Sequence, residues 1–87
     1  MASYSVEWKR SAEKDIRKID PLRIPAIIQT VETLAGDLYP TGCRKLHGTD
    51  RQYRVRIGDY RVIYEVHEEL KIVIVYHIRH RKDAYRR

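Results

Sequence analysis

The stretch Gln52–Val66, with the sequence QYRVRIGDYRVIYEV, decides the predicted fold of this chain. Apolar and polar residues alternate on both sides of Gly58-Asp59, a pattern that is typical of two half-buried strands joined by a two-residue turn. A turn of this length fixes the register, so we expect Ile57 to pair with Tyr60. The sequence therefore predicts a hairpin with one apolar and one polar face.

The polar face of this hairpin carries arginines. In the expected register Arg56 lies opposite Arg61, and Arg54 lies opposite Ile63. Like charges that face each other destabilise a sheet, by some tenths of a kcal/mol up to about 1 kcal/mol. We expect the arginines to bind an anion, because the planar fork of a guanidinium matches phosphate oxygens. The alternative is a solvated face on which the long side chains splay apart.

Local patterns on either side of the hairpin predict the remaining elements. Expected in chain order are a strand at Tyr4–Trp8, a helix that Ser11 caps and Asp20-Pro21 ends, a helix from Ile24 to Ala35 and a strand from Leu70 to Ile78. The last strand is continuously apolar, so its inward-facing residues stay undecided. The prediction is a single domain over residues 1–87 of the α+β class: one N-terminal strand, two helices and a three-stranded antiparallel meander, with the helices packed on one face of an antiparallel sheet.

The charge of the chain is unevenly distributed. Residues 1–43 carry six Lys or Arg and six Asp or Glu, whereas residues 44–87 carry twelve and six, so the whole net charge of +6 belongs to the half with the arginine hairpin. This asymmetry points to a polyanion, such as nucleic acid or an acidic protein, as the partner.

Other features of the sequence exclude several classes of protein. The single cysteine, Cys43, excludes an internal disulfide. No apolar run approaches the roughly 18 residues that a membrane span needs, and residues 1–11 lack the apolar core of a signal peptide. We therefore expect a soluble, cytoplasmic protein with no membrane partner and no cofactor.

Three motifs give the chain a resemblance to a known family. KLHG at residues 45–48, YRVRIGDYRVIYEV at 53–66 and HIRHRKDAY at 77–85 resemble the RelE toxins of the RelE/ParE toxin–antitoxin superfamily. The likeness covers nearly the whole chain, and the combination of motifs is more specific than any one of them. It implies an mRNA interferase, a ribosome-dependent endoribonuclease that cuts mRNA in the ribosomal A site by attack of a 2′-hydroxyl on the adjacent phosphate and so inhibits translation.

The resemblance also implies roles for particular residues. The matching positions around the scissile phosphate give a catalytic set of Arg56, Arg61, Arg81 and Tyr85. The predicted RNA-binding side chains are those of Lys45, Arg54, Arg79, His80 and Lys82.

One departure from the family pattern concerns proton transfer. Lysines at the first two hairpin positions of the best-studied type of member are Arg54 and Arg56 here. Arginine is a poor proton acceptor near neutral pH, but it can stabilise a pentacoordinate phosphorane electrostatically. No metal site is expected at His77 and His80, because Arg79 and Arg81 flank these histidines and would repel a cation.

The partners and the alternatives follow from the same resemblance. It implies an acidic, RelB-like antitoxin, the ribosomal A site with its mRNA, and promoter DNA bound only by the toxin–antitoxin complex. Three alternatives stay open: a ParE-like toxin that poisons DNA gyrase without nuclease activity, a catalytically weak RelE homologue, and a basic nucleic-acid-binding module that is not toxic.

Overall fold

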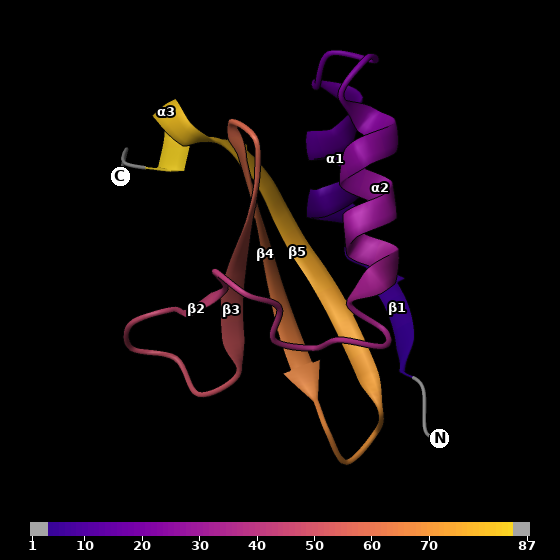
Figure 1. Cartoon of the computed structure of the whole chain (residues 1–87), viewed down its shortest axis with the longest axis vertical. Coiled ribbons are helices and arrows are strands. Elements are labelled where there is room, and N and C mark those ends of the chain that lie inside the picture. Colours follow the sequence, from indigo (N-terminus) through magenta and orange to yellow (C-terminus); the bar gives the residue numbers. More distant parts are fainter. Residues whose placement is uncertain (1–3, 85–87) are drawn as a thin grey trace.

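The computed structural model describes residues 4–84, which form one mixed sheet with helices packed against it (Figure 1). The sheet has the strand order β1-β5-β4-β3-β2. The elements, in chain order, are β1 (Ser5–Trp8), α1 (Arg10–Arg17), α2 (Ile24–Thr33), β2 (Arg44–Lys45), β3 (Gln52–Ile57), β4 (Tyr60–His67), β5 (Ile72–His80) and α3 (Arg81–Ala84). The predicted α+β class is confirmed. No helix in the described part of the chain is long and apolar enough to cross a membrane.

The sheet combines antiparallel and parallel pairing. β3, β4 and β5 form the predicted antiparallel meander. β1, however, pairs with β5 in parallel, so the prediction of an antiparallel sheet is wrong at this edge. The crossover through α1, α2 and the meander carries the chain back in the same direction, which a parallel pair requires. At the other edge, the two-residue strand β2 adds antiparallel to β3.

The central hairpin has the predicted turn and register. Ile57 pairs with Tyr60, so Gly58 and Asp59 are the two loop residues. Gly58 has a φ of +55°, and Asp59 is not among the residues with positive φ. Positive φ at the first loop residue alone is the pattern of a type II′ turn, which suits the twist of the two strands.

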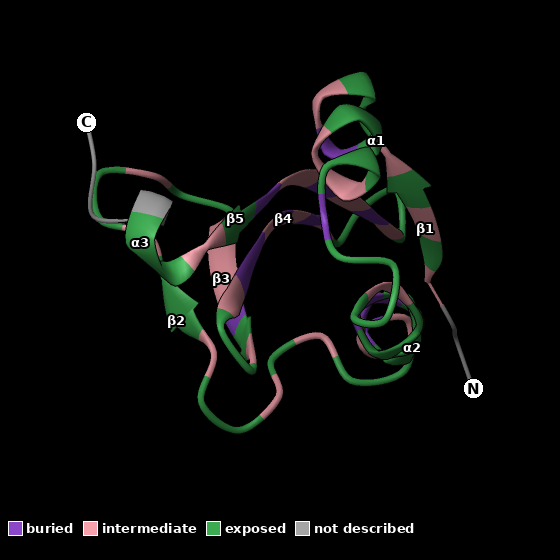
Figure 2. Ribbon diagram, turned by 90° about the horizontal axis from the view of Figure 1, so that it is seen from above, coloured by how far each residue is buried: buried purple, intermediate pink, exposed green. Residues whose placement is uncertain are grey.

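One apolar core lies between the sheet and the helices, and α2 lies over the hollow of the curved sheet (Figure 2). Ala12 of α1, Val31 of α2, and Val62 and Tyr64 of β4 are fully buried members of this core. Burying a side chain of the size of valine contributes on the order of 1.5–3 kcal/mol. The hydroxyl of Tyr64 donates to the carbonyl of Leu38 at 2.7 Å, so its polar atom is satisfied inside the core.

Side chains of α1 bond backbone groups on the part of the β5 edge that does not pair with β1. β1 ends at Trp8, and beyond that point the outer edge of β5 lies beside α1. The Ser11 hydroxyl donates to the carbonyl of Tyr76 at 2.6 Å, and an Asp15 carboxylate oxygen accepts from the amide of Ile78 at 3.0 Å. Ser11 therefore does not cap α1 as predicted, because its hydroxyl bonds the strand edge instead.

A bulge in β5 explains why its inward-facing residues could not be predicted. Val75 pairs with Tyr64 and Ile78 pairs with Val62, so β5 has one residue more than β4 between these two pairs. The extra residue, Tyr76, has no partner on β4, and it shifts the side-chain alternation by one position. The apolar run gives no sign of this bulge, so the sequence alone could not show which side chains of β5 face the core.

Candidate functional site

A row of arginines crosses three strands on the sheet face opposite the core. Arg61 of β4 pairs with Arg56 of β3 on one side and with Arg79 of β5 on the other. The predicted pairing of Arg56 with Arg61 is thus confirmed, and Arg79 extends it. Each like-charge pair costs some tenths of a kcal/mol up to about 1 kcal/mol.

An open cavity of about 570 Å³ lies on this face beside the row. We call it the arginine cavity; its lining residues are Thr41, Gly42, Arg44, Arg54, Arg56 and Arg61. Within the described residues, no ion pair of 4.0 Å or less involves any of these arginines. The cavity therefore offers hydrogen-bond donors and positive charge without a carboxylate to neutralise them.

Arg61 is the most buried of these arginines, with 5% of its surface exposed. One guanidinium nitrogen donates to the Tyr60 carbonyl at 3.4 Å, which is a weak contact. A charged side chain that is buried without a counter-charge is costly unless a partner arrives from outside. An anion in the arginine cavity would offset that cost, and a phosphate has the matching geometry.

The cavity includes a residue that the sequence did not reveal and omits one that it suggested. Arg44 pairs with Arg54 and lines the cavity, whereas the predicted Lys45 pairs with Tyr53 and is not a lining residue. Alternation along β2 places neighbouring side chains on opposite faces. The sequence around Arg44 shows no apolar alternation that could have fixed this parity.

The predicted catalytic residue Arg81 lies at the tip of the hairpin. Its backbone amide donates to the Asp59 carbonyl at 2.6 Å, and its Nε lies 4.0 Å from Asp59 Oδ1. The Arg81 side chain is 58% exposed and does not line the arginine cavity. Lys82, which follows in α3, is exposed, and Tyr85 lies outside the described residues.

His80 is held on the other face of the sheet. It pairs with Tyr60, whose ring packs against the core, and the two ring centroids lie 5.3 Å apart at 87°. Its Nδ1 accepts from the amide of Lys82 at 3.2 Å. The structure therefore does not bring the His80 imidazole into the arginine cavity.

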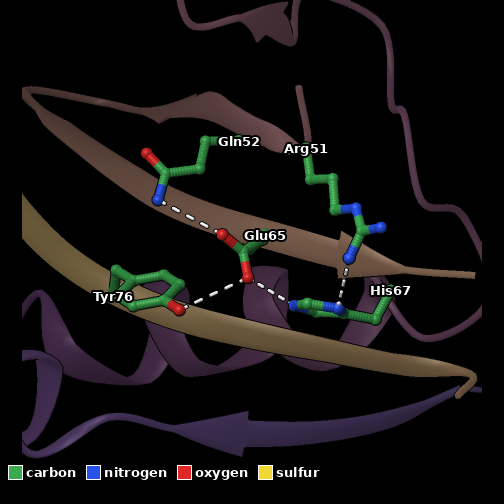
Figure 3. Close-up of polar contacts among 5 residues, drawn as sticks. All are labelled: Arg51, Gln52, Glu65, His67 and Tyr76. Atoms are coloured by element: carbon green, nitrogen blue, oxygen red, sulfur yellow. Dashed lines mark hydrogen bonds and ion pairs between the residues drawn. The ribbon is translucent and has the colours of Figure 1, made fainter. Parts of the chain in front are cut away.

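At the opposite end of β4, a polar network surrounds Glu65 (Figure 3). Glu65 and His67 lie on the same face as Arg61, because an even number of strand residues separates them. Glu65 accepts from the Nε2 of His67, from Gln52 at 3.4 Å and from the Tyr76 hydroxyl at 3.3 Å. Arg51 donates to the Nδ1 of His67 at 3.1 Å. Because arginine can only donate, this bond assigns the His67 proton to Nε2.

The network shifts the pKa values of Glu65 and Tyr76. Burial alone would raise the pKa of Glu65, but the hydrogen bonds from His67, Gln52 and Tyr76 hold it below its ordinary value of 4.5. Burial and the neighbouring Glu65 carboxylate raise the pKa of the Tyr76 hydroxyl. Glu65 is therefore an ionised and fully partnered carboxylate. Its role could not be predicted from the sequence, because its partners come from three strands.

Comparison with known proteins agrees with this fold. Residues 6–85 match the family described as "ParE toxin of type II toxin-antitoxin system, parDE". Toxin RelG of Mycobacterium tuberculosis is 32% identical over 91 residues, which cover 97% of this chain and 98% of that one. A protein designated RelE1 of Methanocaldococcus jannaschii is 33% identical over 86 residues, which cover 95% and 96%. The archaeal RelE–RelB complex from Pyrococcus horikoshii contains a chain that is 26% identical, with a TM-score of 0.80 and coverage of 91% of this chain and 96% of that one.

The fold and these comparisons define a toxin of a type II toxin–antitoxin system. The chain belongs to the ParE toxin family within the RelE/ParE superfamily, and it is a toxin of the RelE type.

Proposed function

We propose that this toxin is an endoribonuclease that enters the ribosomal A site and cuts the mRNA codon there, acting in the cytoplasm. The attacking group is the 2′-hydroxyl beside the scissile phosphate, and the reaction needs no metal ion. The observation that carries the proposal is the arginine cavity, which gathers four arginines without an ion-paired carboxylate in the described part of the chain. Such a site suits a phosphate whose negative charge grows during the reaction.

Two of the cavity arginines bind the scissile phosphate. Arg56 and Arg61 are direct cross-strand partners, so their guanidinium groups can converge on the same anion. The low exposure of Arg61 limits its motion, which makes it a preorganised donor for the phosphorane. Arg54 lies one pleat further along the strand and binds a neighbouring phosphate.

The remaining catalytic roles fall to residues beyond β5. Arg81, at the hairpin tip, stabilises the leaving oxygen, and Tyr85 hydrogen-bonds the reacting hydroxyl and stacks on a base. The cavity arginines supply charge rather than a proton acceptor, because a guanidinium does not release its proton near neutral pH. The proton of the 2′-hydroxyl therefore leaves to a group outside the arginine cavity.

The partners of the proposed toxin are polyanionic or acidic. The solved RelE–RelB complex from Pyrococcus horikoshii supports a RelB-like antitoxin for this chain, and the excess positive charge of residues 44–87 favours an acidic one. The ribosome and mRNA are the targets, and promoter DNA is bound only by the toxin–antitoxin complex. A pull-down from the native host should recover a small acidic protein.

A second candidate function is poisoning of DNA gyrase, and the family description favours it because that description names the ParE toxin. Mapping RNA 5′ ends after induction separates the two. We expect cuts within codons, and these cuts should disappear when translation of the mRNA is blocked. DNA breaks should not accumulate. Intact mRNA together with DNA breaks would identify a gyrase poison instead. Arg61→Ala provides the control, since it removes the cavity donor that cleavage needs.

A further inference from the structure

The turn between β3 and β4 contacts the segment that follows β5 at several points. The Asp59 carbonyl accepts from the Arg81 amide at 2.6 Å, and the Asp59 carboxylate lies 4.0 Å from Arg81 Nε. The adjacent Tyr60 ring packs edge-on against the His80 ring, with the two ring centroids 5.3 Å apart. His80 in turn accepts from the Lys82 amide. The residues that begin α3 are thus held by the hairpin tip, beside which Figure 1 shows α3.

We propose that Asp59 is a positioning residue for Arg81. This inference rests on the proposed function, because it concerns the side chain that faces the leaving oxygen. Arg81 is more than half exposed and belongs to a four-residue helix, so little else restricts its long side chain. The Asp59 carboxylate limits the rotamers of the guanidinium and keeps it at the same end of the sheet as Arg56 and Arg61.

The turn itself does not require an aspartate. Gly58 takes the positive φ that a type II′ turn needs, and the position after it is open to other small polar residues. Asparagine keeps the size of the side chain and the turn preference but removes the charge. Asp59→Asn therefore isolates the contact with Arg81 from the folding of the hairpin.

The stability of the protein should depend little on this pair. Both side chains are largely exposed, at 58% for Arg81 and 64% for Asp59, and exposed ion pairs contribute little to folding. A carboxylate close to a bound polyanion should also repel it. If Asp59 had no role towards Arg81, its neutralisation would leave the cleavage rate unchanged or raise it, so the sign of the effect is diagnostic.

The test measures single-turnover cleavage of mRNA on programmed ribosomes by the full chain. We expect Asp59→Asn to lower the maximal rate about tenfold, which is within the range for a misplaced catalytic group. The ribosome concentration that gives half the maximal rate should not rise. Asp59→Glu, which keeps the carboxylate on a longer stem, should recover part of the rate. Asp37→Asn, the same charge change at an exposed residue after α2, is the matched control and should behave like the parent.

A double-mutant cycle makes the test specific to the pair. In an Arg81→Ala background, Asp59→Asn should have no further effect on the rate, because the side chain that it positions is gone. Independent, multiplicative losses would overturn the proposal, and so would an Asp59→Asn variant as fast as the parent or faster. A parent that cleaves no mRNA would refute the proposed function itself, which is a separate result.

Discussion

Both ends of β4 carry polar side chains on the same face of the sheet. At one end these side chains lie beside like charges, and at the other they have hydrogen-bond partners. Near the turn, Arg61 lies between two other arginines. Near the far end, Glu65 has three side-chain donors, and His67 has partners on both ring nitrogens. A satisfied polar network stabilises the fold, whereas a row of like charges costs free energy. This face therefore has a structural end at Glu65 and, in the function that we propose, a binding end at Arg61.

The largest effect should come from the centre of the arginine row. Arg61→Ala should lower the single-turnover cleavage rate by about a hundredfold or more, the scale of losing one preorganised donor. Its stability should stay within about 1 kcal/mol of the parent, because relief of repulsion offsets the lost packing of the side chain. Ribosome-dependent cleavage and urea unfolding check the two parts, with Arg17→Ala on α1 as the control. If Arg61→Ala unfolds while its folded fraction cleaves normally, Arg61 is structural.

The pairing of Arg56 with Arg61 was predictable because its determinants are local. Alternation of Val55 and Ile57 with arginines sets the faces of β3, and Gly58 sets the turn and hence the register. These two signals together place Arg56 opposite Arg61 without any knowledge of the rest of the fold. The order of the elements along the chain, each read from a local pattern, predicted the meander and the α+β class.

The parts that could not be predicted depend on contacts between distant segments. The Glu65 network joins side chains of three strands, and no local pattern in the sequence reveals such a meeting. The bulge at Tyr76 is likewise invisible in a continuous apolar run. Arg44 rather than Lys45 lines the arginine cavity. The sequence could not predict this, because β2 is only two residues long and has no alternation of its own. Serine is typical of helix caps, but the Ser11 hydroxyl donates instead to the Tyr76 carbonyl at the neighbouring strand edge.

At the far end of β4, loss of a charge should destabilise the protein. Glu65→Gln should lower the free energy of unfolding at neutral pH by about 1–3 kcal/mol, because it weakens hydrogen bonds to a charged acceptor. The folded-state pKa of Glu65 is lowered, so its contribution is present above the ordinary value of 4.5 and is lost as pH falls through the lowered pKa. Urea unfolding from neutral to acidic pH should therefore show the two proteins converging in acid. A constant difference across that range would contradict the network.

A smaller effect separates two adjacent residues of β2. Arg44→Ala should weaken RNA association and reduce the slope of log affinity against log salt by about 1, as expected for one lost phosphate contact. Lys45→Ala is the matched control, because Lys45 is a neighbouring cation that does not line the arginine cavity. Binding of a short RNA titrated at several salt concentrations measures both variants. Equal losses would mean that charge alone, rather than the cavity, governs binding.

The smallest effect is a gain of stability at the arginine end, opposite in sign to the loss at Glu65. Arg56→Thr removes one charge from beside Arg61 and introduces a residue that favours strands, so we expect it to raise the free energy of unfolding by some tenths up to about 1 kcal/mol. High salt should shrink the gain, because screening already weakens the repulsion in the parent. Urea unfolding at low and high salt measures it, and cleavage should fall in the same variant. Equal stabilities at low salt would show that the row carries no repulsion, and the free-energy cost attributed to the binding end would then have no basis.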